Sequence, residues 1–291
     1  MSTRTRIELG RREDLGGDCA NCFGLCCTAL AFSRSVDFPV DKAAGDPCVN
    51  LDDENSCRIH PQLRASGYKG CTVFDCFGAG QKVSRHTFEG RSWRDDTATR
   101  DGMFAVFPLM RRLHELLWYL DVAAALPVES ELRDRVGREF DRVNALTLGQ
   151  PDDLLTLDID SQFEHARPLL LEASAVVRAT RVSGTVPRWA RPGTDRVGVD
   201  LRGCDLRGAD LRGGLLIAAD LRGADLRWCD VLGLDLRDAN LSDADLSAAI
   251  YLTQVQVNGA TGNAGTKLPA GFDRPRHWLG AAPRGPRGPA A

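Results

Sequence analysis

The sequence lacks the features that mark membrane, secreted and nucleic-acid-binding proteins. No apolar run reaches the roughly 18 residues that span a bilayer, and none follows Met1 that could act as a signal peptide. The 37 Lys and Arg against 40 Asp and Glu leave a net charge of −3, which provides no basic field for nucleic acid or an anionic membrane. We therefore expect a cytoplasmic chain that binds neither nucleic acid nor membrane.

Catalytic motifs are absent as well. The chain has no phosphate-binding glycine loop, no nucleophile elbow and no zinc-protease helix, and its five histidines are scattered. We therefore predict no catalytic residues, and the sequence favours a non-enzymatic protein. Its 291 residues suit two or three modules better than one compact domain.

The sequence is rich, by contrast, in a five-residue repeat over residues 199–253, where eleven units follow one another without a gap. Each unit has a large apolar centre, and two residues earlier a position that is mostly small. The centres are Leu201, Leu206, Leu211, Leu216, Leu221, Leu226, Val231, Leu236, Leu241, Leu246 and Tyr251. The earlier positions are Val199, Cys204, Ala209, Gly214, Ala219, Ala224, Cys229, Leu234, Ala239, Ala244 and Ala249.

The odd length of this unit predicts a corner in every unit. Plain strand alternation would point every second leucine outward, so only a repeated turn keeps all the centres inside. One buried stripe with repeated corners indicates a solenoid of stacked coils. Outward Asp and Arg, two residues apart in most units, predict a solvated and locally neutralised surface. Cys204 and Cys229 stand at small interior positions and are expected to pack as small apolar residues.

The stretches DLRGCDLRGADLRG, ADLRGADLRWCD and DANLSDADLSAA resemble the pentapeptide-repeat family, whose signature is Ala-Asp/Asn-Leu-x-x. The resemblance implies a right-handed, four-sided β-helix. The segment after Thr253 resembles the one that follows the repeats in many bacterial members, and we expect it to cap the last coil. Gyrase-protecting members mimic DNA, but those solenoids are long, dimeric and strongly acidic. Residues 199–253 hold ten Asp and six Arg, so a gyrase- or topoisomerase-binding DNA mimic is kept only as an alternative.

A second informative region lies near the other end of the chain, where eight of the ten cysteines fall. They are Cys19, Cys22, Cys26, Cys27, Cys48, Cys57, Cys71 and Cys76. In a reducing compartment, dense cysteines favour metal binding over disulfides, and the tight spacing of the first four brings soft ligands together with little loop-closure entropy. All eight are candidate metal ligands, with redox thiols and inert packing as the alternatives.

Residues 17 to 80 resemble the zinc- or iron-chelating domain family named for its CxxxCC motif. The residues that match the motif are Cys22, Cys26, Cys27, Cys57 and Cys71. Further candidate ligands are Cys19, Cys48, Cys76 and His60. The resemblance implies zinc, iron or an iron–sulfur cluster as cofactor, because some members linked to protein methylation are thought to carry such a cluster. Eight thiols could hold two four-cysteine zinc sites or one cluster with spare cysteines, and an iron–sulfur enzyme or accessory factor stays an alternative.

Between the cysteine-rich segment and the repeat, apolar residues recur at helical spacing. We predict a first helix that Pro108 opens and Pro127 ends, a second that starts at Ser130, and a third over about 161–182. The apolar face of the second helix is expected to consist of Leu132, Val136, Phe140 and Val143. The predicted fold is a multidomain α+β chain. Its parts are a cysteine-rich metal-binding domain at 17–80, a helical domain at 81–186, a pentapeptide-repeat β-helix at 194–253, a cap at 254–278 and a disordered tail at 279–291.

Two adjoining faces of the predicted solenoid carry apolar residues where the repeat places polar ones. They are Leu215 and Ile217 on one face, and Leu232, Ile250, Leu252 and the nearby Trp228 on the other. A contiguous apolar group indicates a covered surface, so we expect the chain's own helices or tail, or a protein partner, to dock there. The sequence as a whole predicts a metal-binding protein whose solenoid serves protein–protein interaction.

Overall fold

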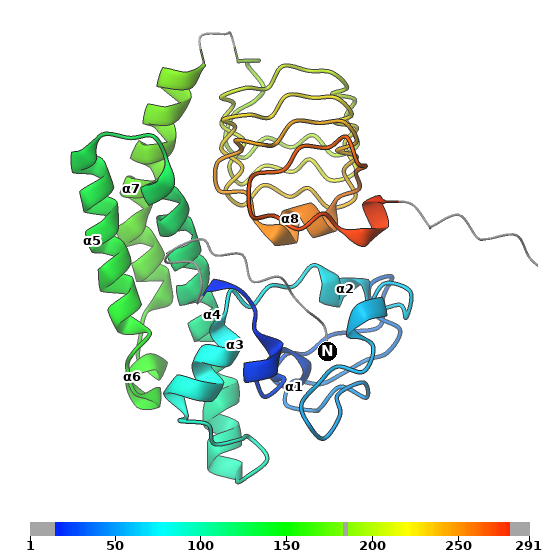
Figure 1. Ribbon diagram of the computed structural model, residues 1–291, viewed down its shortest axis with the longest axis vertical. Coiled ribbons are helices and arrows are strands. Elements are labelled where there is room, and N and C mark those ends of the chain that lie inside the picture. Colours follow the sequence, from blue (N-terminus) through cyan, green and yellow to red (C-terminus); the bar gives the residue numbers. More distant parts are fainter. Residues whose placement is uncertain (1–14, 183–185, 280–291) are drawn as a thin grey trace, which may run out of the picture. The chain divides into compact units, whose positions relative to one another are not determined.

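The computed structural model describes residues 15–182 and 186–279, which divide into two compact units (Figure 1). The first unit ends at Ala173 and the second begins at Ser174, so the long helix α7 (Ile159–Arg181) contributes to both. The predicted disordered tail lies outside the described residues apart from Leu279.

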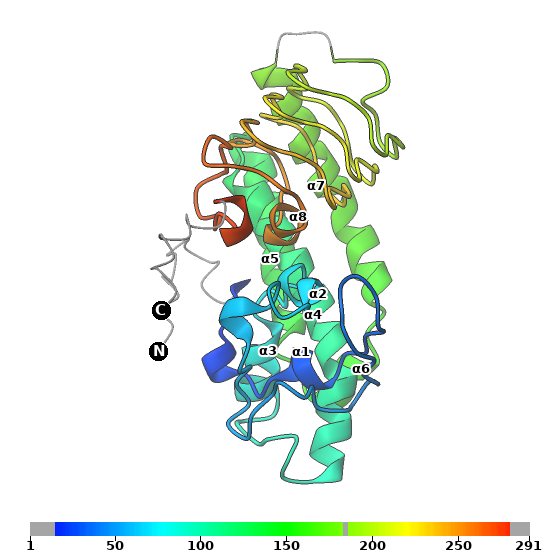
Figure 2. The same ribbon diagram turned by 90° about the vertical axis from the view of Figure 1, so that its right-hand side faces the viewer.

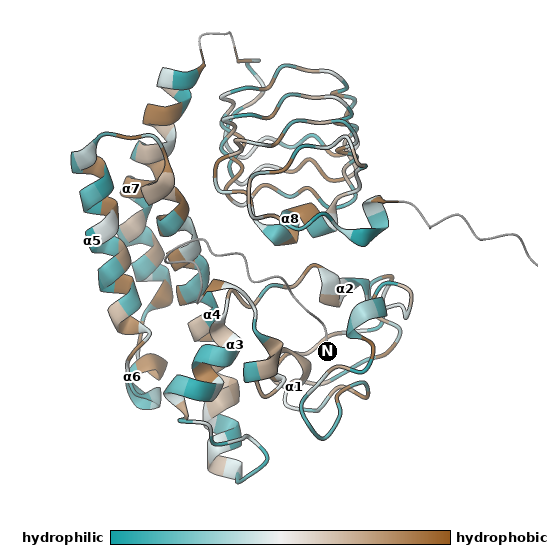
Figure 3. Ribbon diagram, viewed as in Figure 1, coloured by the Kyte–Doolittle hydropathy of each residue, from teal (hydrophilic) through white to brown (hydrophobic). Residues whose placement is uncertain are grey.

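The helices of the first unit pack amphipathic faces against one another. α4 (Thr97–Ala125) packs along α5 (Ser130–Leu146) and against the short α6 (Pro151–Leu155). Figure 3 shows apolar and polar residues interspersed along these helices, as amphipathic packing requires. The predicted start of α5 is confirmed, and its predicted apolar face is buried. That face consists of Leu132, Val136, Phe140 and Val143.

The predicted start of the first helix was wrong. α4 begins at Thr97, well before Pro108, because the carboxylate of Asp96 accepts a hydrogen bond from the Thr99 N–H at 2.8 Å and caps the helix there. Pro108 lies inside α4 and removes one backbone hydrogen bond, a defect that costs roughly 3 kcal/mol. The neighbouring Phe107 and Met110 are fully buried, and this packing offsets the cost.

The cysteine-rich segment is built from short helical turns joined by loops. Its helical pieces are η2 (Cys19–Asn21), α1 (Leu25–Thr28), η3 (His60–Gln62), α2 (Lys69–Thr72), α3 (Ala79–Gln81) and the π-helix η4 (Lys82–Thr87). Two isolated antiparallel bridges, Phe32 with Lys42 and Leu51 with Cys57, connect the loops. Both α1 and α3 contact α4, so the loops are anchored on the longest helix of the unit.

The second unit is dominated by a solenoid of stacked coils (Figures 1 and 2). Parallel bridges join residues one coil apart, from Asp195 with Leu215 to Asp230 with Ile250, and each coil therefore takes twenty residues, or four five-residue units. Only one residue in each unit forms a bridge before the chain turns. The described residues of this unit consequently contain isolated bridges instead of continuous strands.

The predicted corner in every unit is confirmed from Leu201 to Leu241. Two residues after each apolar centre, the backbone enters the left-handed region, as type II turns require. Glycine fills most of these corners because it has no Cβ, as at Gly203, where φ is 63°. Trp228 occupies one such corner with a φ of 62°.

The interior of the solenoid follows the predicted register. All eleven apolar centres are buried. The small positions are buried too, except for the half-buried Val199, Cys204 and Ala249 near the two ends of the repeat. Arg202 and Asp200 form an exposed ion pair at 2.6 Å, typical of the outward positions.

The tail continues the stack beyond the repeat. After α8 (Gln254–Gly259), Thr261 bridges Asn240 and Lys267 bridges Asp245. Trp278, in the last turn η5 (Arg276–Trp278), is buried in the same apolar core. The tail therefore covers coil edges that would otherwise be open.

Candidate functional site

The thiols of the cysteine-rich segment gather from separate parts of the chain. Cys26 and Cys27 lie in α1, whose start follows Gly24 in a left-handed conformation with a φ of 68°. Cys71 lies in α2, and Cys57 forms the bridge to Leu51. No disulfide joins any of the ten cysteines, all of which lie in the described residues.

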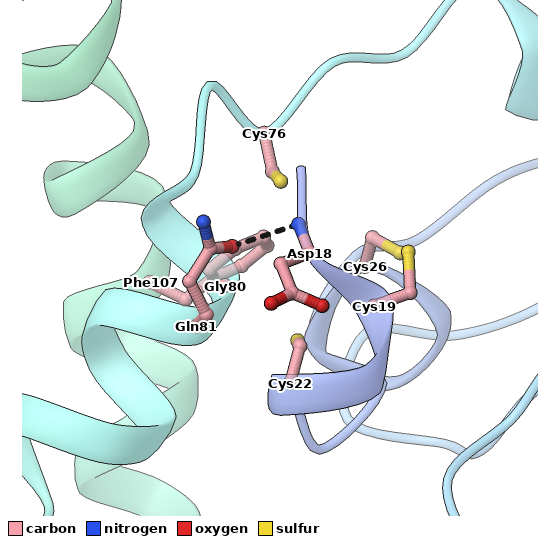
Figure 4. Close-up of a pocket in the computed structure, with 8 residues that line it drawn as sticks. All are labelled: Asp18, Cys19, Cys22, Cys26, Cys76, Gly80, Gln81 and Phe107. Carbon is pink, nitrogen blue, oxygen red and sulfur yellow. Dashed lines mark hydrogen bonds between the residues drawn. The ribbon is translucent and has the colours of Figure 1, made fainter. Parts of the chain in front are cut away.

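Four of these cysteines surround a small cavity (Figure 4). We call them the cavity thiols: Cys19, Cys22, Cys26 and Cys76. The cavity has a volume of about 20 Å³ and is also lined by Asp18, Gly80, Gln81 and Phe107. A space of this size accommodates one water molecule or one ion.

Gly80 allows the closest approach to this cavity. A Cβ atom at position 80 would lie 2.7 Å from the Cys22 sulfur and 3.9 Å from the Cys76 sulfur. Two hydrogen bonds of the next residue also hold the cavity lining in place, because the Gln81 side chain accepts from the Asp18 N–H at 3.2 Å and donates to the Gly16 carbonyl at 2.7 Å. The segment before α1 is thereby tied to α3.

The other four cysteines form a second group, which we call the loop thiols: Cys27, Cys48, Cys57 and Cys71. Cys27 and Cys57 share a side-chain hydrogen bond. Cys48 lies close enough to Cys27 and Cys71 to interact electrostatically with both. The sulfurs of Cys26 and Cys27, 3.9 Å apart, connect the two groups.

Backbone N–H groups point at three of the sulfurs. Gly24 and Leu25 donate to Cys22, Ile59 and His60 donate to Cys57, and Gly78 and Gly80 donate to Cys76. Each donor pair follows its cysteine closely in sequence, so a tight turn wraps each sulfur. Such donors favour a charged thiolate over a neutral thiol.

Burial nevertheless keeps the thiols of Cys71 and Cys76 protonated at neutral pH. It raises the pKa of Cys76 to about 11 and that of Cys71 to about 11. The hydrogen bond with Cys26 and that with Cys57 act in opposite directions on Cys27, whose pKa is raised overall, with the Cys26 contact as the largest cause. A charged partner is therefore needed before these sulfurs ionise at neutral pH.

Lys42 supplies a positive charge beside the loop thiols. Its ammonium group is buried and donates to the carbonyl oxygens of Thr28, Ala43 and Asp46 at 2.7 to 3.0 Å. Burial lowers its pKa, while the charges of Cys48 and Asp46 act in the opposite direction. No sequence pattern marks this lysine, and only the loop fold brings it to the site.

The donor set suits zinc or iron in its chemistry, since thiolates are the preferred ligands of both in closed sites and clusters. The sulfur atoms, however, lie farther apart than the ligands of a metal-bound site do. Within residues 15–182 and 186–279, no three Cys, His, Asp or Glu side chains converge closely enough to hold an ion at the present separations. The structure therefore brings all eight predicted ligands into two neighbouring groups without closing a metal site.

The histidines and the remaining cysteines lie elsewhere. The His60 side chain is exposed, and it is its backbone N–H that donates to Cys57. His114 is buried with Nδ1 2.8 Å from the Phe77 carbonyl oxygen, and His165 is an exposed residue beside Glu139. In the solenoid, the buried Cys229 thiol donates to the Leu206 carbonyl at 2.7 Å, as a packing cysteine does.

Comparison with known proteins covers both units. The family of pentapeptide repeats matches residues 197–231 and 219–250 in eight copies. The uncharacterized protein YybG of Bacillus subtilis (strain 168) is 49% identical over 278 residues, which is 96% of this chain and 100% of that protein. The chain belongs to the YybG family. The similarity to YybG runs through the cysteine-rich segment as well as the solenoid.

A solved structure shares the repeat. This pentapeptide repeat protein from the thylakoid lumen of Arabidopsis thaliana is 27% identical, over 27% of this chain and 57% of its own, with a TM-score of 0.12. A TM-score this low does not support a fold assignment. The solenoid of the YybG-family chain is therefore identified from its own bridges and corners. No helix in its described parts is long and apolar enough to cross a membrane.

One of the two apolar solenoid faces is covered from within the second unit. Ser174 of α7 donates to Asp230 at 2.5 Å, and Arg178 pairs with Asp210 at 3.1 Å. Arg181 lies over the Trp228 ring, 5.6 Å from its centroid. Asp210 and Asp230 stack in one column with Ile250, so residues 174–181 of α7 dock on one of the two faces where the sequence predicted cover by the chain's own helices or tail, or by a protein partner.

The adjoining face is left open. Leu215 is 37% exposed and Val197 is 55% exposed, while Ile217 is half-buried. Of the two predicted alternatives, cover by the chain's own helices holds for one face, and the other face presents apolar side chains to solvent.

Proposed function

We propose that this YybG-family chain is a metal-binding protein whose solenoid docks a protein partner. The cysteine cluster binds zinc, iron or an iron–sulfur cluster and serves a structural role or senses metal or redox state. The observation that carries the proposal is that eight cysteines from separate loops lie in two neighbouring groups, with backbone N–H donors at Cys22, Cys57 and Cys76. Ten cysteines in one chain, eight of them within residues 19–76, suit a reducing compartment such as the cytoplasm, where thiolates bind metal instead of forming disulfides.

The metal would contribute to folding. The loops that carry the thiols contain only short helical turns and two isolated bridges. Their main apolar anchors are a few buried side chains such as Leu25 and Phe77. In sites of this kind, metal binding supplies much of the folding free energy, because the ligands come together only in the bound state. The resemblance of residues 17–80 to the CxxxCC family supports the same proposal.

Metal analysis of protein purified without oxygen and without chelators tests it. We expect bound zinc in a colourless protein, or bound iron and sulfide with broad absorbance near ~400 nm. Reconstitution of the reduced apoprotein with each metal is the second arm. A chain that retains neither metal and takes up neither on reconstitution would exclude the proposal.

The partner surface is the open solenoid face formed by Val197, Leu215 and Ile217. Pentapeptide repeats suggest a role in protein–protein interaction, and contiguous exposed apolar side chains mark interaction sites. A variant with all three residues changed to Ser should lose cross-links to its partner in cells, whereas a variant with Arg202 and Arg222 changed to Ser, which alters exposed positions on another face, should keep them. Equal cross-linking by the two variants would exclude this face as the docking site.

A further inference from the structure

The eight thiols separate into groups of equal size. The four cavity thiols border one small space, whereas the four loop thiols interact among themselves. Cys26 and Cys27 are the point of contact, with sulfurs 3.9 Å apart. A closed zinc site takes four ligands in a tetrahedron, so each group holds one complete set.

Each group contains at least one sulfur that accepts hydrogen bonds from two backbone N–H groups. In the cavity group, the sulfurs of Cys22 and Cys76 do so, and these two cysteines lie before and after the loop thiols in sequence. In the loop group it is Cys57. Donors of this kind orient a ligand and stabilise its charge before the metal arrives, which an inert packed thiol does not need.

The cavity group also has a space of the right size. Its cavity of about 20 Å³ lies among four thiols and is closed on another side by Gly80 and Phe107. Because a Cβ at position 80 would reach within 2.7 Å of the Cys22 sulfur, any larger residue there would displace that thiol. At the loop group, the buried ammonium of Lys42 lies beside the sulfurs and offsets thiolate charge.

We propose that the chain binds two thiophilic divalent ions of the zinc type, one in each group of four thiols. This inference rests on the proposed metal binding and specifies its number and its ligands. Cys19 and Cys76, which lie outside the CxxxCC motif, complete the first centre together with Cys22 and Cys26. The second centre is formed by Cys27, Cys48, Cys57 and Cys71, and binding draws each set inward from its present separation.

Titration of the reduced apoprotein with Co²⁺, with exclusion of oxygen, counts the sites. Tetrahedral thiolate ligation gives Co²⁺ intense ligand-field bands, and we expect these bands to saturate at two equivalents per chain. A chain that binds no Co²⁺ and no Zn²⁺ would exclude metal binding altogether. Saturation at one equivalent would leave the proposed function intact and overturn the division into two centres.

Variants then assign the centres. Cys76→Ser and Cys71→Ser should each halve the stoichiometry, to one equivalent, and should leave different centres occupied. Cys19 is exposed, so Cys19→Ser is a second test of the cavity group in which misfolding is not expected. Cys204→Ser, in the solenoid, is the matched control and should retain two equivalents. A Cys19→Ser protein that still binds two ions with tetrahedral ligation would overturn the proposed ligands of the first centre. Assembly of iron and sulfide into one cluster with ligands from both thiol groups would overturn the division into two centres.

Discussion

Asp230 shows how one residue can depart from the rule of its own repeat. Equivalent residues such as Asp200 are exposed and paired with a neighbouring arginine, whereas Asp230 is fully buried. Its carboxylate accepts hydrogen bonds from Ser174 and from the Leu232 N–H, and Arg212 lies 3.4 Å away. The repeat pattern could not predict this burial, because the residue responsible lies in α7, far away in sequence.

A pH dependence follows from that burial, which raises the pKa of Asp230 to about 6 from its ordinary 3.8. The folded state then holds the proton more tightly than the unfolded state, so Asp230 lowers the free energy of unfolding as pH rises through this window. The change amounts to roughly 3 kcal/mol. Asp230→Asn should flatten the dependence, as measured by hydrogen exchange of peptides around residue 230 in the full chain. The exposed Asp195→Asn serves as control, and a wild-type slope in Asp230→Asn would contradict the assignment.

At the scale of elements, predictions from periodicity succeeded where the cause was local. The start of α5 and its buried face followed from apolar spacing, and the corners of the solenoid followed from its odd period. The start of α4 was missed because Pro108 looked like a first-turn proline, whereas Asp96 had already capped the helix at Thr97. The short α6 was not predicted, and its Leu154 is buried by packing that no periodic pattern in so short a segment could reveal.

The stacking of coils gives a test within one unit of the repeat. Leu221 is fully buried among the centres of neighbouring coils, whereas the next residue, Arg222, pairs with Asp220 at the surface. Leu221→Ala should leave a cavity and destabilise the solenoid by about 2–5 kcal/mol. Arg222→Ala should change the stability little, because exposed ion pairs contribute little to it. Thermal unfolding of both variants is the measurement, and equal midpoints would contradict the inward register.

For the molecule as a whole, the sequence predicted where the solenoid and the cysteine-rich segment lie along the chain. It did not predict that the eight cysteines of that segment would separate into two groups. The repeat and the cysteine-rich segment were both recognisable from spacing, and the similarity to YybG extends over 96% of this chain. The separation into cavity thiols and loop thiols depends on loop paths that carry no periodic signal. Lys42 and Gly80 were missed for the same reason, since a single lysine or glycine in a loop has no pattern of its own.

The division into two units predicts that loss of metal acts on one of them alone. Replacing Cys26 and Cys27 by Ser removes a sulfur from each thiol group and should release bound metal, so the loops around residues 17–80 should become sensitive to protease. The solenoid has its own apolar core and backbone ladder, and it should stay resistant in the same sample. Limited proteolysis with mass spectrometry locates the first cuts, and a chelator added to the unmodified protein should reproduce them.

Cys204→Ser and Cys229→Ser are the controls that should retain both metal and protection. First cuts inside the repeat, or full metal content in the Cys26 and Cys27 double variant, would show that these two thiols do not hold the first unit together.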